Sequence, residues 1–488
     1  MNENINDSRK MPFGWALFCI GFLFVSMVAS LLWLDIPIHI NLLISIGICL
    51  GVSWLNNGRD WKKLSDAIDY AGSIAMQPTI IMMLIGALIA SWIACGTVPF
   101  IIYWGLKIIS PSIFLVTACI ICAIVAIASG SSWSTAGTVG VALMGIGAGL
   151  NVNPAMTAGA IISGAYFGDK MSPMSDTTNL SSAVAEADLF DHIRSMVYTA
   201  GPSMLGTLII YLVLGIKHSA TGVNSELIMQ TLTAIRENFN IGGFNGLLVI
   251  IPALVVIVMA VKKCPSIPTL MVSTLVACLV AIAVQRVHFT SIVDILMDGF
   301  SIDSGFADFD RLMNRGGLQS MLWTASLGML GMLYGAIMEK TGLLEAFLEK
   351  MKSMTKSLGG LVTTVVLTNI ILLAATASQT LAIVVGGRMY VTEFKKKDLL
   401  PQTLSRTLED SGTVVSPLIP WSLCGVYMAG TLGVDAISFV PFSFFCWFCP
   451  ILAIIYGFTG KFFWKTGEKA SQRTYRPLTE EEMAKLSK

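Results

Sequence analysis

One polar run constrains this chain more than any other stretch: residues 168–182, GDKMSPMSDTTNLSS, lie between apolar segments long enough to sit in a bilayer. The run carries two carboxylates, Asp169 and Asp176, together with Lys170 and a helix-interrupting Pro173. Backbone without regular hydrogen bonds is tolerated at membrane depth only where protein or water satisfies it, and carboxylates there are costly. We therefore expect the run to line a cavity, where its oxygen atoms would suit a small, hard cation.

The composition is that of a membrane protein. Of 488 residues, 55% are hydrophobic and 12% are charged, and the mean hydropathy is +0.74. These values predict an all-α polytopic membrane protein surrounded by a lipid bilayer. A net charge of +1 gives no basic field for nucleic acid. Because the sequence shows neither a His/Cys/Asp ligand set nor a Ser–His pairing, we expect a transporter without a cofactor, and no enzyme.

Apolar runs of membrane-spanning length divide the chain into five parts. We expect a cytoplasmic N-terminus over 1–12, a transmembrane hairpin over 13–55, two repeats over 56–262 and 263–458, and a cytoplasmic tail over 459–488. Counting the apolar runs gives about 11–13 transmembrane helices. Residues 56–70, which contain Arg59, Lys62 and Lys63, are expected to form a cytoplasmic loop with a short amphipathic helix on the membrane surface.

The two repeats share an order of elements. Two spans, a small polar break, a short helix and a break rich in serine, proline and acid occur once through Ser129 and Ser172, and again through Ser378 and Ser416. Paired interrupted helices are typical of transporters with inverted-topology repeats, whose site lies at the repeat interface near the bilayer midplane. We therefore predict two inverted repeats with broken helices or re-entrant hairpins. The alternative is two unrelated segments that both contain serine and proline.

Candidate ion or substrate ligands lie in these polar segments. Together they are Ser129, Ser131, Ser132, Asp169, Ser172, Ser175, Asp176, Thr177, Thr178, Asn179, Ser378, Gln379, Thr380, Glu409, Asp410, Thr413 and Ser416. The residues expected to hold Na⁺ itself are Asp176, Asp169, Thr177 and Asn179, and Asp176 is the first choice because it has the richest polar surroundings. Asp169 has an alternative role as the partner of Lys170 in an ion pair that holds the loop shut. The hydroxyls of the polar breaks have the alternative role of letting helices pack closely.

The acids of the second repeat are adjacent, so on a helix Glu409 and Asp410 point about 100° apart. We expect one of them to face the cavity and the other to be a capping or loop residue. Arg388 and Arg406 would pair with a substrate carboxylate if they lay at the cavity edge, although a positive-inside role is the alternative for both.

Other polar and aromatic residues receive lesser roles. Trp133 and Trp421 flank the two breaks and are candidates for the cavity wall. The run 186–194, which includes His192, is expected to be a solvated cytoplasmic turn. Cys446 and Cys449 are interpreted as packing thiols.

The motifs GDKMSPMSDTTNL and LEDSGTVVSPLIPW resemble those of the NhaC family of sodium/proton antiporters, which includes malate/lactate antiporters. The resemblance implies a secondary transporter of the bacterial inner membrane, with a cation site over 169–179 and a second contribution from 409–416. The chain departs from the family pattern at Ser422 and Leu423, where members often have asparagine and a small polar residue. That departure indicates either an altered ion site or room for an organic substrate.

The expected function is exchange of Na⁺ for H⁺ by alternating access, in which Asp176, Asp169 and one second-repeat acid bind the two cations alternately. The alternative is a Na⁺- or H⁺-coupled transporter of an organic anion or an amino acid. A channel is a third possibility, but paired broken helices favour gated exchange. A small organic substrate and a homodimer remain open as partners.

Overall fold

The structure is a computed structural model that describes residues 11–34, 36–56, 61–220, 225–262, 264–351 and 357–465. Within these ranges the regular structure is helical, apart from one isolated β-bridge between Leu399 and Lys465. The predicted all-α class is therefore confirmed. Most of the expected N-terminal segment and C-terminal tail lies outside the described residues, as does Arg59.

The chain begins with a helical hairpin and continues into a first set of helices. Their bounds are α1 (Phe13–Ala29), α2 (Ile38–Asn56), α3 (Trp61–Ala94), α4 (Thr97–Ile108), α5 (Phe114–Ser129), α6 (Ser132–Thr135), α7 (Val141–Gly149), α8 (Pro154–Met171), α9 (Asp176–Val184), α10 (Leu189–Ala220), α11 (Ser225–Asn238), α12 (Phe244–Val249) and α13 (Ile251–Val261). A π-helical turn, Ala136–Gly140, joins α6 to α7.

A second set of helices completes the described chain. Their bounds are α14 (Ser266–Gln285), α15 (Phe289–Asp298), α16 (Ala307–Met313), α17 (Leu318–Lys340), α18 (Leu343–Met351), α19 (Leu358–Thr376), α20 (Gln379–Lys396), α21 (Pro401–Leu408), α22 (Leu423–Leu432), α23 (Ala436–Phe439) and α24 (Phe444–Thr459). A second π-helical turn, Glu409–Thr413, directly follows α21.

Eight helical segments of the described chain are long and apolar enough to cross a membrane, and there are up to ten if each of two bent pairs, α21–α22 and α23–α24, counts as one span. This number is lower than the expected count of about 11–13. One reason is that α1, with 17 residues, falls short of the length of a full span. The helices beside the polar breaks are shorter still, since α6 has 4 residues and α7 has 9.

The predicted surface helix over 56–70 is wrong for the part that the structure describes. Residues from Trp61 onwards belong to α3, which runs without a break for 34 residues. The sequence is amphipathic there, but Leu64, Ala67 and Ala71 are buried against other parts of the protein. The apolar face at the start of α3 therefore packs against other residues of the protein, and the helix continues without a break.

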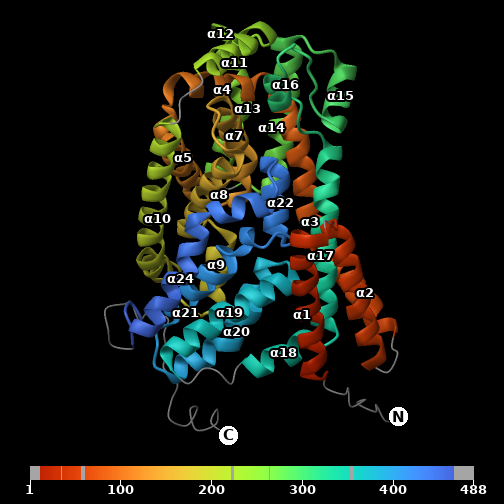
Figure 1. The fold of residues 1–488 in the computed structure, drawn as a ribbon, viewed down its shortest axis with the longest axis vertical. Coiled ribbons are helices and arrows are strands. Elements are labelled where there is room, and N and C mark those ends of the chain that lie inside the picture. The colour runs from red at the N-terminus through yellow and green to blue at the C-terminus, as the bar shows by residue number, and fades with distance from the viewer. Residues whose placement is uncertain are drawn as a thin grey trace.

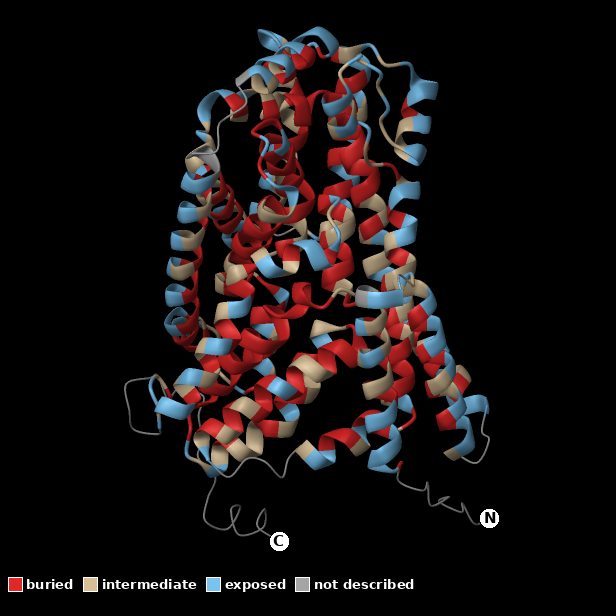
Figure 2. Cartoon of the chain, viewed as in Figure 1, coloured by how far each residue is buried: buried red, intermediate tan, exposed pale blue. Residues whose placement is uncertain are grey.

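The helices pack along one long axis with the polar breaks in the interior (Figure 1). α3 and α17 lie side by side. Helices α5 and α7 lie toward the upper end in this view, whereas α19 and α20 lie toward the lower end together with α18 and α21. Buried residues fill the interior, and the outer helices α1, α2 and α10 carry many exposed residues (Figure 2). Much of that exposed surface consists of large apolar side chains, such as Val25 and Leu205, as expected of a surface in contact with lipid.

Two glycines let α5 and α8 pack backbone to backbone. A Cβ atom at Gly164 would overlap the carbonyl oxygen of Cys119, and one at Gly168 would overlap that of Ala123. Small residues allow helices in membranes to approach this closely. The close approach matters for the site because Asp169 follows Gly168 directly, so this contact sets the position of the carboxylate.

Replacing Gly164 with valine should destabilise the protein, because the new side chain would force α5 and α8 apart. Overpacking of this kind costs about 1–3 kcal/mol. Thermal unfolding of the detergent-solubilised protein, followed by size-exclusion chromatography, measures the loss. Gly201→Val on α10 is the matched control, since nothing lies within 4 Å of a Cβ at Gly201. Equal stability of the two variants would contradict the close packing.

Candidate functional site

Four serines cap the helices that resume after the polar breaks. The side-chain oxygens of Ser131, Ser175, Ser378 and Ser422 accept hydrogen bonds from the backbone N–H groups of Ser134, Thr178, Leu381 and Gly425, at 3.1, 3.4, 3.3 and 3.0 Å. Each cap satisfies a donor that the start of a helix leaves free. Ser131 and Ser175 are 44 residues apart in the sequence, and Ser378 and Ser422 are also 44 apart. The two halves therefore place their caps with the same spacing.

Other predicted ligands hold the central run in place. The Ser172 hydroxyl donates to the carbonyl of Ile127 at 2.8 Å, and Thr178 donates to that of Lys170 at 3.1 Å. The amide nitrogen of Asn179 donates to the carbonyls of Pro173 and Ser175, at 3.0 and 2.7 Å. Ile127 and Lys170 lie in the last turns of α5 and α8, and Pro173 and Ser175 lie between α8 and α9. These donors therefore satisfy carbonyls at helix ends and in the break, as a break at membrane depth requires.

The central run and the first break line a small cavity of about 160 Å³. The predicted residues that it brings together are Ser131, Ser132, Asp169, Ser175, Asp176, Thr177 and, from the second half, Gln379. Trp133 also lines the cavity, as expected, whereas Trp421 does not. The remaining predicted ligands lie outside this wall: Ser129, Ser172, Thr178, Asn179, Ser378, Thr380, Glu409, Asp410, Thr413 and Ser416.

The sequence analysis did not predict the cavity-lining residues that come from the unbroken helices α3 and α14. Gln77 of α3 lies on the wall, and so do Ser266 and Leu270 of α14. A signal for Gln77 was present, because a glutamine directly before Pro78 is unusual in an apolar helix. Ser266 opens α14 after Pro265 and carries no comparable signal.

The two acids of the central run differ in burial. Asp169 is 5% exposed, and its Oδ2 accepts hydrogen bonds from the backbone N–H and the hydroxyl of Ser132, at 3.1 and 2.7 Å. Ser132 is the first residue of α6, so the carboxylate faces the N-terminal end of a helix, where negative charge is favoured. Asp176 is exposed and borders the same cavity. Asp169 is therefore the more buried of the two acids, whereas the sequence made Asp176 the first choice as the ion ligand.

Lys170 does not pair with Asp169, so that alternative was wrong. The Lys170 ammonium lies 2.9 Å from Asp410 Oδ1, and both side chains are fully buried. Consecutive residues of a helix point about 100° apart, so Asp169 can face the cavity while Lys170 reaches the second half. Thr199 of α10 donates to the same carboxylate oxygen at 3.0 Å. A buried ion pair thus joins the two halves.

Both second-half acids are buried, which corrects the expectation that one would cap a helix or lie in a loop. Glu409 and Asp410 are fully buried because they start the π-helical turn within the broken helix. Such turns are frequent at functional sites. Ser181 donates to Glu409 Oε1 at 3.1 Å, whereas the other oxygen, Oε2, has no hydrogen-bond partner. Glu409 is therefore a buried acid whose hydrogen bonding is incomplete.

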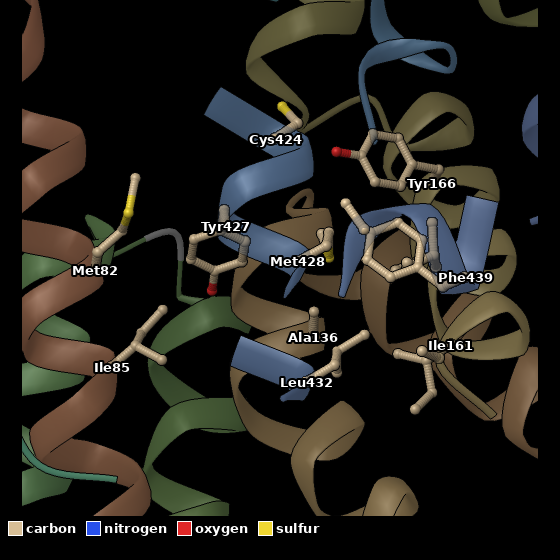
Figure 3. Packing of buried hydrophobic residues seen from close by; sticks show 14 of the residues in the cluster. Met82, Ile85, Ala136, Ile161, Tyr166, Cys424, Tyr427, Met428, Leu432 and Phe439 are labelled. Atoms are coloured by element: carbon tan, nitrogen blue, oxygen red, sulfur yellow. The ribbon is translucent and has the colours of Figure 1, made fainter. Parts of the chain in front are cut away.

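The second break carries a hydrogen bond that matches the one at Asp169. Ser416 donates to Gln379 Oε1 at 3.1 Å, across 37 residues, the same sequence separation as between Ser132 and Asp169. Gln379, like Ser132, is the first residue of the helix after its break. Ser416 also contacts the hydroxyl of Tyr166 at 3.3 Å, and Figure 3 shows that ring beside Cys424. The second half thus reproduces the geometry with a neutral pair instead of a carboxylate.

Trp133 forms part of the cavity wall, and Tyr427 packs against it. The rings of Trp133 and Tyr427 stack with their centroids 4.0 Å apart and an interplanar angle of 9°. The Tyr427 hydroxyl also donates to the Trp133 carbonyl at 2.7 Å. Figure 3 shows Tyr427 between α3, which carries Met82 and Ile85, and α22. Trp421 has a structural role, because its indole N–H donates to the carbonyl of Ala374 at 2.8 Å.

The arginines and His192 lie away from this cavity. Arg388 is exposed, whereas Arg406 is fully buried, with its guanidinium over the rings of Phe463 and Trp464, 4.9 and 5.8 Å from their centroids. Neither arginine borders the cavity. His192 is also fully buried and contacts Ser405 Oγ at 2.7 Å, so the expectation of a solvated turn was wrong at this residue. Helix α10 begins at Leu189, which turns His192 inward.

Comparison with known proteins finds relatives over nearly the whole chain. The model of the Na⁺/H⁺ antiporter family matches residues 16–216 and 164–461. A Na(+)/H(+) antiporter NhaC of Alkalihalophilus pseudofirmus is 37% identical, over 93% of this chain and 96% of its own length. The malate-2H(+)/Na(+)-lactate antiporter of Bacillus subtilis is 34% identical, over 94% of this chain and 97% of its own. The arginine/ornithine antiporter ArcD of Halobacterium salinarum is 34% identical, over 97% of each chain.

Removing either partner of the buried ion pair should destabilise the protein more than removing both. Lys170→Met or Asp410→Leu leaves one uncompensated buried charge, which costs about 3–5 kcal/mol, whereas the double variant leaves none. Thermal unfolding of the single and double variants measures the coupling. The partly exposed pair of Lys396 and Glu393 is the control, with an expected effect below about 1 kcal/mol. Additive losses at Lys170 and Asp410 would show that the pair is not coupled.

Proposed function

Because the chain belongs to the Na⁺/H⁺ antiporter family, we propose that it exchanges Na⁺ for protons across a membrane by alternating access. The observation that carries this proposal is a buried carboxylate, Asp169, in a small polar cavity between two broken helices. The expected setting is the bacterial inner membrane, with both chain ends on the cytoplasmic side.

The cavity suits a small cation. Asp169 and Asp176 supply carboxylate oxygens, and Ser132, Thr177 and Gln379 supply neutral ones. Hard cations prefer such oxygen ligands. A carboxylate holds either a cation or a proton, so the two compete for one anion, and that competition is itself a mechanism of exchange. At about 160 Å³ the cavity is close to the volume of about 150 Å³ that holds a benzene molecule, so it has room for an ion and for no more than a small solute.

Glu409 is proposed as a second proton-binding group. Asp410 has Lys170 as its counter-ion, whereas the ion pairs found among the described residues include none with Glu409. An uncompensated charge is costly inside a membrane protein. Because Glu409 is fully buried and one of its oxygens has no hydrogen-bond partner, we expect this acid to bind a proton. Ser181, which donates to the other oxygen, connects this acid to α9, the helix that the second part of the central run forms.

An inverted repeat remains our prediction for how access alternates. Two observations support it: the equal spacing of the serine caps, and the position of α5 and α7 toward one end while α19 and α20 lie toward the other (Figure 1). In transporters of this kind, one repeat or bundle moves against the other around a fixed site. Here the Lys170–Asp410 pair links the two halves, so movement between them would change the surroundings of both charges.

Transport in proteoliposomes tests the proposal and separates it from transport of an organic solute. Vesicles that hold a pH gradient receive Na⁺ alone, and internal pH is followed. Malate, lactate, arginine and ornithine are then added one at a time as labelled solutes, because two relatives are named for transport of these compounds. Proton movement on Na⁺ alone is the expected result. Silence with Na⁺ alone, together with ion-driven uptake of one organic solute, would overturn Na⁺/H⁺ exchange in favour of that rival.

Asp169→Asn should weaken apparent Na⁺ affinity more than Asp176→Asn. Asp169 is buried and Asp176 is exposed. Loss of a buried charged interaction, about 1.5–3 kcal/mol, corresponds to roughly 10–100-fold. At the exposed Asp176, where water screens the charge, we expect less than about tenfold. The Na⁺ dependence of proton movement measures both variants, and unchanged affinity in Asp169→Asn would remove this residue from the site.

Glu409→Gln should lower the number of protons moved for each Na⁺ while the purified protein still binds Na⁺. The glutamine keeps a group that can accept the Ser181 hydrogen bond but cannot release a proton at neutral pH. Internal pH in vesicles and labelled Na⁺ binding to the purified protein are measured in parallel. Glu345→Gln, at an exposed position on α18, is the control. Normal proton movement in Glu409→Gln would show that this acid carries no proton in the cycle.

A further inference from the structure

A large apolar groove lies behind the first polar break, and the ion site does not use it. It is formed by parts of α4, α5, α7, α13 and the α6 region, with a volume of about 670 Å³. Its wall is almost entirely carbon, with Trp92, Ile121 and Leu143 among the contributors. Ser134, in the same break, contributes to the walls of both this groove and the cation cavity.

Three of the five hydroxyls on the groove wall, those of Thr117, Thr135 and Thr138, donate to backbone carbonyls at 2.9 Å or less. Thr135 donates to the carbonyl of Ser131 at 2.9 Å, and Thr138 donates to that of Ser134 at 2.6 Å. A buried water needs two to four polar partners, and apolar cavities stay dry. Water is therefore a poor occupant of this groove.

The mouth of the groove is continuous with the lipid-facing surface. Ile108, Ile124 and Val261, which line it, are 76%, 62% and 58% exposed. Two of its walls, α5 and α12–α13, belong to candidate membrane spans, and the span of α12–α13 is the least buried of the eight. In a bilayer this surface meets acyl chains, so a chain can enter the groove from the side.

We propose that the groove binds one acyl chain of a membrane lipid, seated against the back of the broken helix. The volume is more than four times the ~150 Å³ that accommodates benzene in an apolar cavity, which leaves room for an extended hydrocarbon. Burying the chain there replaces a void with carbon contacts along the whole wall. The bound chain would pack against the segment that carries Ser132, and so would restrain the residue that donates to Asp169.

Trp92 reports on the groove interior because it lines the groove and is only 2% exposed. The protein is reconstituted with phosphatidylcholine whose acyl chain carries bromine, a contact quencher, or with the unbrominated lipid. The emission lost on replacing Trp92 with phenylalanine gives the contribution of this residue in each lipid. We expect that contribution to be lost in the brominated lipid.

A variant whose groove is filled by a larger side chain is compared with a variant that carries the same side chain outside the groove. Ala260→Phe places a ring on the groove wall, whereas Ala283→Phe on α14 adds the same ring at an exposed position outside it. Quenching of Trp92 should disappear in Ala260→Phe and persist in Ala283→Phe. Native mass spectrometry is a second readout that does not depend on Trp92, and Ala260→Phe should retain one lipid fewer than the wild type and the control. Two results together would overturn the proposal. The first is that the brominated lipid does not quench Trp92, or quenches it equally in both variants. The second is that both variants retain as much lipid as the wild type.

Discussion

Backbone polar groups inside a bilayer must find partners within the protein, and this requirement shapes the whole centre of the molecule. Two helices stop in the interior, after Ser129 and after Thr376, and the chain resumes each time with a serine cap. The N-terminal end of α6 then becomes a place where a carboxylate is stabilised. Asp169 occupies that place because close packing of α5 and α8 brings it there. The polar break and the acid are thus parts of one arrangement.

The charged groups at the centre of the molecule are one buried ion pair and two buried acids that take part in none of the ion pairs found among the described residues. Lys170 and Asp410 neutralise each other across the two halves, and Thr199 adds a hydrogen bond from α10. Glu409 and Asp169 have hydroxyl partners instead. In a low dielectric, a change of charge on one member of a buried ion pair leaves the other charge uncompensated, at a high cost in free energy. An acid with only hydroxyl partners can exchange a proton for a cation at a lower cost in free energy. The ion pair supplies a link between halves, and the other two acids supply sites at which charge can change.

From the sequence we could predict where the polar breaks lie, but not which side chains contact one another across the two halves. Polar runs between apolar segments located both breaks, and Asp169, Asp176 and Gln379 do share one cavity. The partner of Lys170 could not be predicted, because it lies 240 residues away, at Asp410, and depends on how the halves pack. The π-helical turn that buries both second-half acids also has no sequence signature, since helical periodicity assumes regular turns.

The central claim is that Na⁺ and a proton compete for a buried carboxylate. Equilibrium binding of labelled Na⁺ to the purified protein across a range of pH tests it directly, without reconstitution. Competition with one proton predicts an apparent Kd that rises about tenfold for each unit of pH below the titration of the carboxyl, with an unchanged number of sites. A Kd that does not depend on pH, with Na⁺ still bound, would contradict the claim.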